Sequence, residues 1–185
     1  MTIYLMRHGE PTFRDTAALG LPGMGAELGQ LKPEGILQAE EAAKDSRIQD
    51  VDLIVASPFP RALQTAAVVS RYIDKPIDVA VGIFEWLPRI DYSAPSHTEI
   101  KEAWEEYKRN AGVHTPADKY PDWETHLQMR ERARKAIQPY LERQDINKLL
   151  IVCHGGIMRA LMNQPALKKI HYCEIRELTP EMLTD

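Results

Sequence analysis

The sequence has few cysteines and no long hydrophobic run. Only Cys153 and Cys173 occur among 185 residues, too few for a disulfide framework, and neither has the spacing of a zinc site. We therefore expect reduced thiols and a cytoplasmic protein. No apolar run approaches the roughly 20 residues of a membrane-spanning helix. The first residues lack the basic leader of a signal peptide, so we expect neither export nor a membrane partner.

Positive charge is not in excess either. The chain has 23 Lys and Arg against 27 Asp and Glu, a formal net charge of -4. Proteins that bind nucleic acid usually gather Lys and Arg on one face, so we predict no nucleic-acid partner. A Walker loop and a dinucleotide-binding fingerprint are both missing, and we predict no cofactor.

The composition is that of an ordinary folded domain. Hydrophobic residues make up 44% and charged residues 27% of the chain, close to the average for globular proteins. A length of 185 residues suits one domain with a substantial core. We therefore predict a single domain over residues 1–185.

Apolar runs alternate with segments of helical periodicity. We predict strands at residues 2–6, 52–56 and 77–79, at 148–153 and within 170–178. We predict helices at residues 33–46, 61–72, 96–110, 122–143 and 157–163, with Asp122 capping the fourth. Residues 12–30 contain four glycines and are expected to form a long surface loop. The alternation predicts an α/β fold, a three-layer α/β/α domain with a mostly parallel central sheet.

Polar residues follow two of the predicted strands. Arg7, His8 and Gly9 end the first strand, and His154 with Gly155 ends the strand at 148–153. Ligands of open α/β sheets bind beyond the carboxyl ends of strands, so the two histidines are expected to share one site. The guanidinium of Arg7 matches phosphate oxygens, and Gly9 allows close approach of the backbone. The alternative is that His154 is a turn residue and His8 a packed histidine.

Arg61 lies where a helix is expected to begin. Acidic side chains are normally preferred at that position, and such local conflicts are typical of functional sites. Two guanidinium groups around one phosphate would stabilise the charge on its oxygens during transfer. A solvent-exposed Arg61 is the alternative.

These residues carry a resemblance to a known family. Residues 5–10 (Leu-Met-Arg-His-Gly-Glu) resemble the signature of the histidine phosphatase superfamily, the phosphoglycerate mutase-like proteins. Residues 31–39, 57–66 and 152–156 resemble three further motifs of this family, in the same order. The resemblance extends from Met1 to about Leu161 and implies a phosphoglycerate mutase-like fold.

The resemblance also implies an activity, that of a phosphoric monoester hydrolase acting through a phosphohistidine on His8. Arg7, Arg61, His154 and Gly155 would form the phosphate pocket. Glu85 would donate the proton to the leaving group, as a carboxylic acid can, with Asp91 in reserve. No metal would be needed, because arginine and imidazolium supply the positive charge.

Three alternatives remain open. The chain could be a phosphoglycerate mutase, although it lacks the longer basic insertions of those enzymes, or a non-catalytic phosphate-binding module. It could also act on phosphohistidine proteins rather than on a small phosphorylated molecule. The sequence does not decide whether Arg14 or the aromatic residues Trp86, Tyr92 and Trp104 contact substrate, nor whether the chain forms a homodimer.

Overall fold

A five-stranded sheet forms the centre of the molecule. The structure, a computed structural model, describes residues 1–21, 23–93, 95–165 and 169–184. The strand order is β5-β4-β6-β1-β7. The strands are β1 (Thr2–Arg7), β4 (Leu53–Ala56), β5 (Ile77–Val79), β6 (Lys148–Cys153) and β7 (Ile175–Glu177). The first four run parallel and β7 is antiparallel to β1, so the mostly parallel sheet is confirmed.

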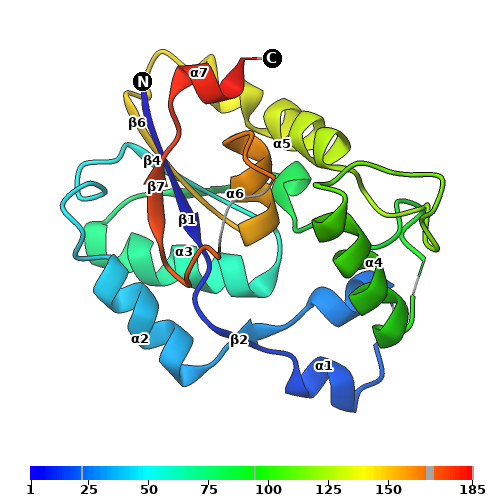
Figure 1. Ribbon diagram of the computed structural model, residues 1–185. Coiled ribbons are helices and arrows are strands. Elements are labelled where there is room, and N and C mark those ends of the chain that lie inside the picture. Colours follow the sequence, from blue (N-terminus) through cyan, green and yellow to red (C-terminus); the bar gives the residue numbers. More distant parts are fainter. Residues whose placement is uncertain (22, 94, 166–168, 185) are drawn as a thin grey trace.

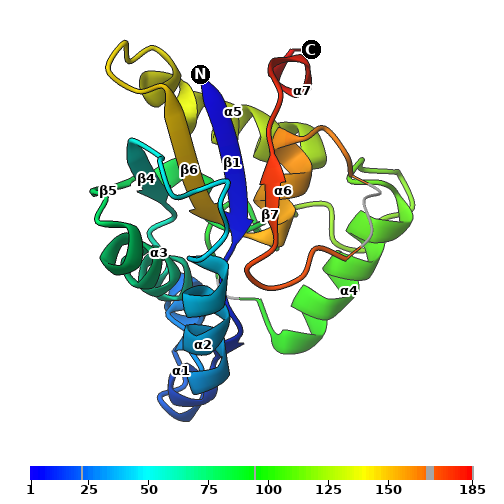
Figure 2. The ribbon, with the colours of Figure 1, turned by 90° about the vertical axis from the view of Figure 1, so that its left-hand side faces the viewer.

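Helices cover both faces of this sheet (Figures 1 and 2). One face carries α2 (Pro33–Ala42) and α3 (Pro60–Ile73), and the other carries α5 (His126–Leu141) and α6 (Gly155–Leu161), with α4 (His97–Arg109) beside them. The three-layer α/β/α arrangement is thus confirmed. Within the described ranges, no helix is long and apolar enough to cross a membrane. A short helix, α7 (Pro180–Leu183), follows β7.

The apolar runs of the sequence become strands that are buried on both faces. Successive side chains of a strand point to opposite sides of the sheet. In β6, Leu149 and Ile151 pack with α5 and α6, whereas Leu150 and Val152 pack with α3. A strand covered on both sides needs apolar residues at every position, which is why β6 reads as an uninterrupted hydrophobic run.

Two helix boundaries differ most from the prediction. Helix α5 begins after Thr125 rather than Asp122, because Thr125 and Gln128 form a reciprocal capping box and the N–H of Glu124 is already bonded to the carbonyl of Leu87. The shift leaves Leu127 exposed instead of facing the core. Helix α2 ends at Ala42, four residues earlier than predicted.

Residues 12–30, predicted to form a long surface loop, contain short regular elements. The segment contains α1 (Arg14–Ala18) and a 3-10 helix, η1 (Gly23–Glu27), between the short strands β2 (Pro11–Thr12) and β3 (Gln30–Leu31). Antiparallel pairing of β2 with β3 closes the segment at its base. It lies beyond the carboxyl end of β1, below the arrowhead of that strand in Figure 2.

The last strand lies within the predicted range 170–178 and occupies Ile175–Glu177. Before β7, Cys173 adopts a left-handed backbone conformation with φ of 56°, which a regular strand does not contain. Its N–H donates to the carbonyl of Arg7. The chain therefore turns beside the end of β1 before it pairs with that strand.

Candidate active site

The topology brings the two predicted histidines together. Strands β1 and β6 are parallel neighbours, with Arg7 opposite Cys153. The two segments that follow these strands therefore leave the sheet side by side. The imidazole centroids of His8 and His154 are 5.1 Å apart. Both side chains are buried. The fold therefore brings His8 and His154 to one place beyond the carboxyl ends of β1 and β6.

The hydrogen bonds of His8 define which ring nitrogen is free. Its Nδ1 lies 2.7 Å from the carbonyl oxygen of Gly9, which only accepts, so Nδ1 carries the proton and Nε2 keeps its lone pair. The pKa of His8 is lowered to about 3, chiefly by burial and then by the positive charge of Arg61, while the bond to Gly9 opposes the shift. His8 is therefore neutral, with an unprotonated Nε2, near pH 7.

Close backbone packing holds the His8 loop in place. A Cβ on Gly9 would lie 2.4 Å from the carbonyl oxygen of Gly35, and a Cβ on Gly35 would meet the backbone of Glu10 at 2.3 Å. The N–H of Gly9 donates to the hydroxyl of Thr65 at 3.0 Å, and that hydroxyl donates to the carbonyl of Arg61. The start of α2 and the first turn of α3 thus fix the loop.

The partners of His154 point to the same tautomer as in His8. Ser57 Oγ lies 2.7 Å from His154 Nε2 and accepts a hydrogen bond from the N–H of Phe59, and we assign the proton of Ser57 to the bond with Nε2. The proton of His154 is then on Nδ1, which is buried without a partner among the described residues. Burial, followed by the charge of Arg61, holds the pKa of His154 well below its usual range.

Arg61 is buried rather than exposed to solvent, so that alternative was wrong. Only 3% of Arg61 is accessible. Its guanidinium donates to the carbonyl oxygen of Glu27 at 2.9 Å and to the carboxylate of Glu27 at 2.7 Å. The charge of Arg61 lowers the pKa of both histidines, which indicates that the guanidinium lies close to them. Glu27, from η1, therefore occupies part of its hydrogen-bonding capacity.

Arg7 is held by contacts with the segment that precedes β7. Its Nη1 donates to the carbonyl of Ile170 at 2.6 Å, and its guanidinium lies 4.2 Å from the ring centroid of Tyr172. A Cβ on Gly155 would lie 3.3 Å from Arg159 Nη1 and 3.7 Å from Arg7 Nε. Gly155 therefore separates two guanidinium groups, and Arg159 is an arginine of this region that the sequence did not indicate.

Glu85 lies next to the turn that follows His154. Its carboxylate accepts hydrogen bonds from the N–H of Gly156 at 3.1 Å and from its neighbour Trp86 at 2.9 Å. A Cβ on Gly156 would lie 2.2 Å from Glu85 Oε1, so this contact requires glycine. Asp91, the reserve candidate, is exposed and faces Arg89 at 3.5 Å instead.

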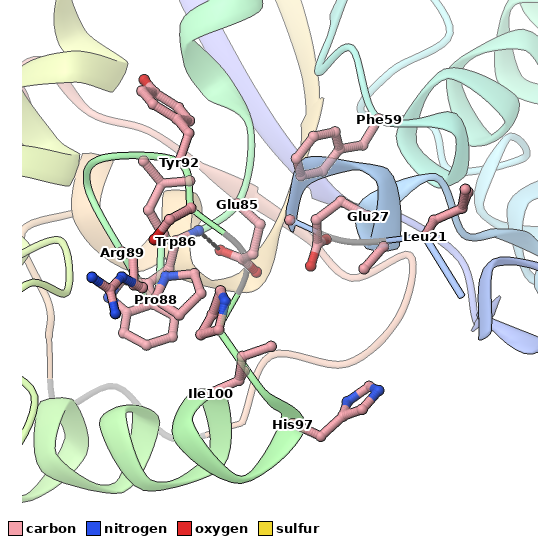
Figure 3. A pocket seen from close by; sticks show the side chains of 15 residues that line it. Leu21, Glu27, Phe59, Glu85, Trp86, Pro88, Arg89, Tyr92, His97 and Ile100 are labelled. Carbon is pink, nitrogen blue, oxygen red and sulfur yellow. Dashed lines mark hydrogen bonds between the residues drawn. The ribbon is translucent and has the colours of Figure 1, made fainter. Parts of the chain in front are cut away.

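A small cavity opens beside Glu85 (Figure 3). Phe59 lines it and contacts the His154 ring edge-on, at a centroid distance of 5.3 Å. Trp86 and Tyr92 also line the cavity, as one interpretation of the sequence had it. Trp104 instead stacks on Tyr107, with centroids 5.0 Å apart. The side chain of Arg14 is 85% exposed and pairs with Asp15, as a solvated loop charge does.

Several contacts of the site were missed by sequence reasoning. Ser57, Phe59 and Thr65 lie within the motif at residues 57–66. No local sequence pattern indicated that they contact the segments that carry His8 and His154. Glu27 and Tyr172 carry no sequence signal, because their contacts come from distant parts of the chain. Within the part of the chain that the structure describes, no three His, Cys, Asp or Glu side chains are grouped to hold a metal ion.

Acid should destabilise the fold through His8. The unfolded chain protonates this residue near its ordinary pKa of 6.5, whereas the folded state does so only near a pKa of about 3. The contribution of His8 to the free energy of unfolding is complete above about pH 7. It falls as the pH drops, by up to about 1.4 kcal/mol per pH unit. Denaturant unfolding at pH 7, 6 and 5 should show a shallower decline in His8→Asn. Equal declines in both proteins would contradict this assignment.

Comparisons with known proteins agree with this geometry. The model of the histidine phosphatase superfamily (branch 1) matches residues 3–179. The uncharacterized phosphatase PhoE of Bacillus subtilis is 27% identical over 162 residues, covering 88% of this chain and 76% of that protein. The probable phosphoglycerate mutase GpmB of Yersinia enterocolitica is 25% identical over 170 residues, covering 88% and 74%.

Solved structures show the same fold. A mycobacterial glucosyl-3-phosphoglycerate phosphatase in complex with VO3 superposes with a TM-score of 0.68 at 19% identity, covering 98% of this chain and 93% of that one. The family model spans nearly the whole chain and includes His8, Arg61 and His154. The chain belongs to the histidine phosphatase superfamily.

Proposed function

We propose that this chain is a metal-independent phosphatase that hydrolyses a phosphomonoester through a phosphohistidine on His8. The observation that carries the proposal is the pair of facing imidazoles. His8 offers an Nε2 lone pair, and His154 offers a buried, unpartnered Nδ1–H. A nucleophile, a neutral donor and the charges of Arg7 and Arg61 together supply what phosphoryl transfer requires.

The first step transfers the phosphoryl group to His8. Arg7 and Arg61 bind the non-bridging oxygens, and the Nδ1–H of His154 donates to one of them. Nε2 of His8 attacks phosphorus as the bond to the ester oxygen breaks and its electron pair goes to that oxygen. Glu85 gives its proton to the departing oxygen, so a neutral alcohol leaves. Arg61 must exchange the Glu27 carboxylate for phosphate during binding.

The second step returns the enzyme to its starting state. Glu85, now a carboxylate, accepts a proton from water while the water oxygen attacks phosphorus. The N–P bond breaks, its electron pair returns to His8 Nε2, and inorganic phosphate forms. Two backbone N–H groups keep the Glu85 carboxylate in one orientation, which suits a group that acts as acid and then as base.

The test is an assay of a panel of phosphomonoesters in the presence of EDTA. We expect release of inorganic phosphate without any acceptor molecule, with His8→Ala as the background preparation. Phosphate release that requires added metal would overturn metal independence. Conversion of 3-phosphoglycerate to 2-phosphoglycerate, with little free phosphate, would favour the mutase alternative. Binding of inorganic phosphate without any turnover would favour a binding module.

Glu85→Gln should show a loss that depends on the leaving group. Alkyl phosphates need a protonated leaving oxygen, so their kcat/KM should fall by about 10²- to 10⁴-fold. 4-Nitrophenyl phosphate releases a stable anion and should lose much less. Asp91→Asn is the matched control and should stay within about twofold for both substrates, since surface changes have small effects. An equal loss for both ester types would remove Glu85 from the proton-transfer role.

We also propose a cytoplasmic location. Cys153 and Cys173 are both free and buried, and a protein without disulfides suits a reducing compartment. Fractionation of the source cells, with immunodetection of the protein, tests the location. Recovery outside the cytoplasmic fraction would contradict it.

A further inference from the structure

The cavity beside Glu85 is small and mostly apolar. Most of its lining is carbon, contributed by apolar and aromatic side chains: Leu21, Ala26, Phe59, Trp86, Leu87, Pro88, Tyr92, Pro95 and Ile100. Its volume is about 100 Å³, less than the roughly 150 Å³ of an apolar cavity that holds benzene. The enclosed part therefore has room for a short branched alkyl group or one edge of a ring, and anything longer extends through the mouth.

Two carboxylates face this cavity near the catalytic residues. Figure 3 shows Glu27 and Glu85 among the side chains that line the cavity, Glu27 on the side of Phe59 and Glu85 on the side of Trp86. Glu27 projects from η1 and keeps its carboxylate on Arg61. When phosphate takes over that guanidinium, the charge of Glu27 is left beside the leaving group.

The cation that lines the cavity does not offset these charges. The guanidinium of Arg89 lies at the edge of the group in Figure 3, away from Glu27. It faces Asp91 at 3.5 Å and Asp122 at 3.7 Å, so its charge is balanced outside the cavity. His97, at the mouth, is exposed. Among the described lining residues, no arginine is therefore left to balance the charge of Glu27 once Arg61 binds phosphate.

We infer that the substrates of this site are phosphomonoesters of small uncharged alcohols with an apolar body, and that Glu27 determines specificity by rejecting acids. The inference rests on the proposed function. A carboxylate on the leaving group would lie in an apolar space near the Glu27 carboxylate, and Arg89, the arginine among the described lining residues, already faces two aspartates. Desolvation and repulsion both oppose its binding. A branched alkyl group of the same size fits without either penalty.

The test compares isosteric phosphonates, whose binding does not depend on turnover. 4-Methylpentylphosphonate, 4-phosphonobutanamide and 4-phosphonobutanoate differ only at the end group, which is apolar, polar or charged. Calorimetric titration should give a Kd for the alkyl compound about 100-fold lower than for the acid, with the amide between them. In Glu27→Gln the advantage of the amide over the acid should shrink by about tenfold. Glu40→Gln, which removes an exposed carboxylate of α2, should leave it unchanged.

The outcomes separate this inference from the proposed function. Equal or tighter binding of the acid by the native protein, or an unchanged ratio in Glu27→Gln, would overturn the inference even if phosphatase activity is found. The esters 3-methylbutyl phosphate and 3-phosphooxypropanoate report turnover. If the alkyl phosphonate binds with the expected preference and 3-methylbutyl phosphate releases no phosphate, the specificity stands and the proposed function fails.

Discussion

His8→Ala should lower kcat for phosphate release by at least about 10⁴-fold, because the nucleophile and the first bond of the reaction are both lost. The remaining groups would still bind phosphate, so KM should change far less than kcat. His8 is a demanding position to replace, since its free Nε2 depends on the bond from Nδ1 to the carbonyl of Gly9. An imidazole elsewhere cannot supply the same lone pair.

Rapid quenching measures this effect directly. With ³²P-labelled ester, the native protein should hold label that is stable in alkali and released by acid, as a phosphoramidate is, and His8→Ala should hold none. His97→Ala is the control, because His97 is an exposed histidine at the mouth of the cavity and should keep turnover within about threefold, as surface changes do. Substantial turnover in His8→Ala, or label that survives acid, would place the nucleophile elsewhere.

Arg61→Ala should lower kcat/KM by about 10³-fold, the cost of removing a buried donor that stabilises the transferring group. Phosphate loses a bidentate hydrogen-bond donor, and the Glu27 carboxylate that remains repels the phosphate. Arg61→Lys restores the charge without the planar fork, so it should recover only about tenfold of that loss.

The control for Arg61 lies on the same helix. Arg71→Ala removes an exposed arginine from the last turn of α3 and should alter kcat/KM by less than about twofold. Thermal unfolding of each variant shows whether the fold persists. If Arg61→Ala folds and retains a tenth of the native kcat/KM, the phosphate is bound by other groups.

The part of the site that follows strand ends could be predicted from the sequence. Apolar runs at 2–6 and 148–153 must be buried on both faces, and side chains after parallel strands meet at one edge of the sheet. His8 and His154 were found in this way. Their tautomers were not, because Ser57 reaches His154 across 97 residues of sequence and no local pattern encodes that bond.

The part formed by tertiary contacts could not be predicted. Glu27 meets Arg61 only because β2 pairs with β3 and folds residues 12–30 back over the site, and short elements of that kind have little intrinsic propensity. The start of α5 shifted for a similar reason. Glu124 is held by Leu87, from a distant segment, and that bond outweighed the capping preference of Asp122.

Through the contact between the glycines at positions 9 and 35, helix α2 influences the orientation of the nucleophile. Gly35 touches neither phosphate nor leaving group, yet its first extra carbon would strike the backbone of Glu10 and tilt the peptide that orients the nucleophile. In a deep mutational scan for activity, substitutions at position 35 will therefore be as damaging as substitutions of the residues that react with phosphate. Its inactive variants will still be found folded in the cell.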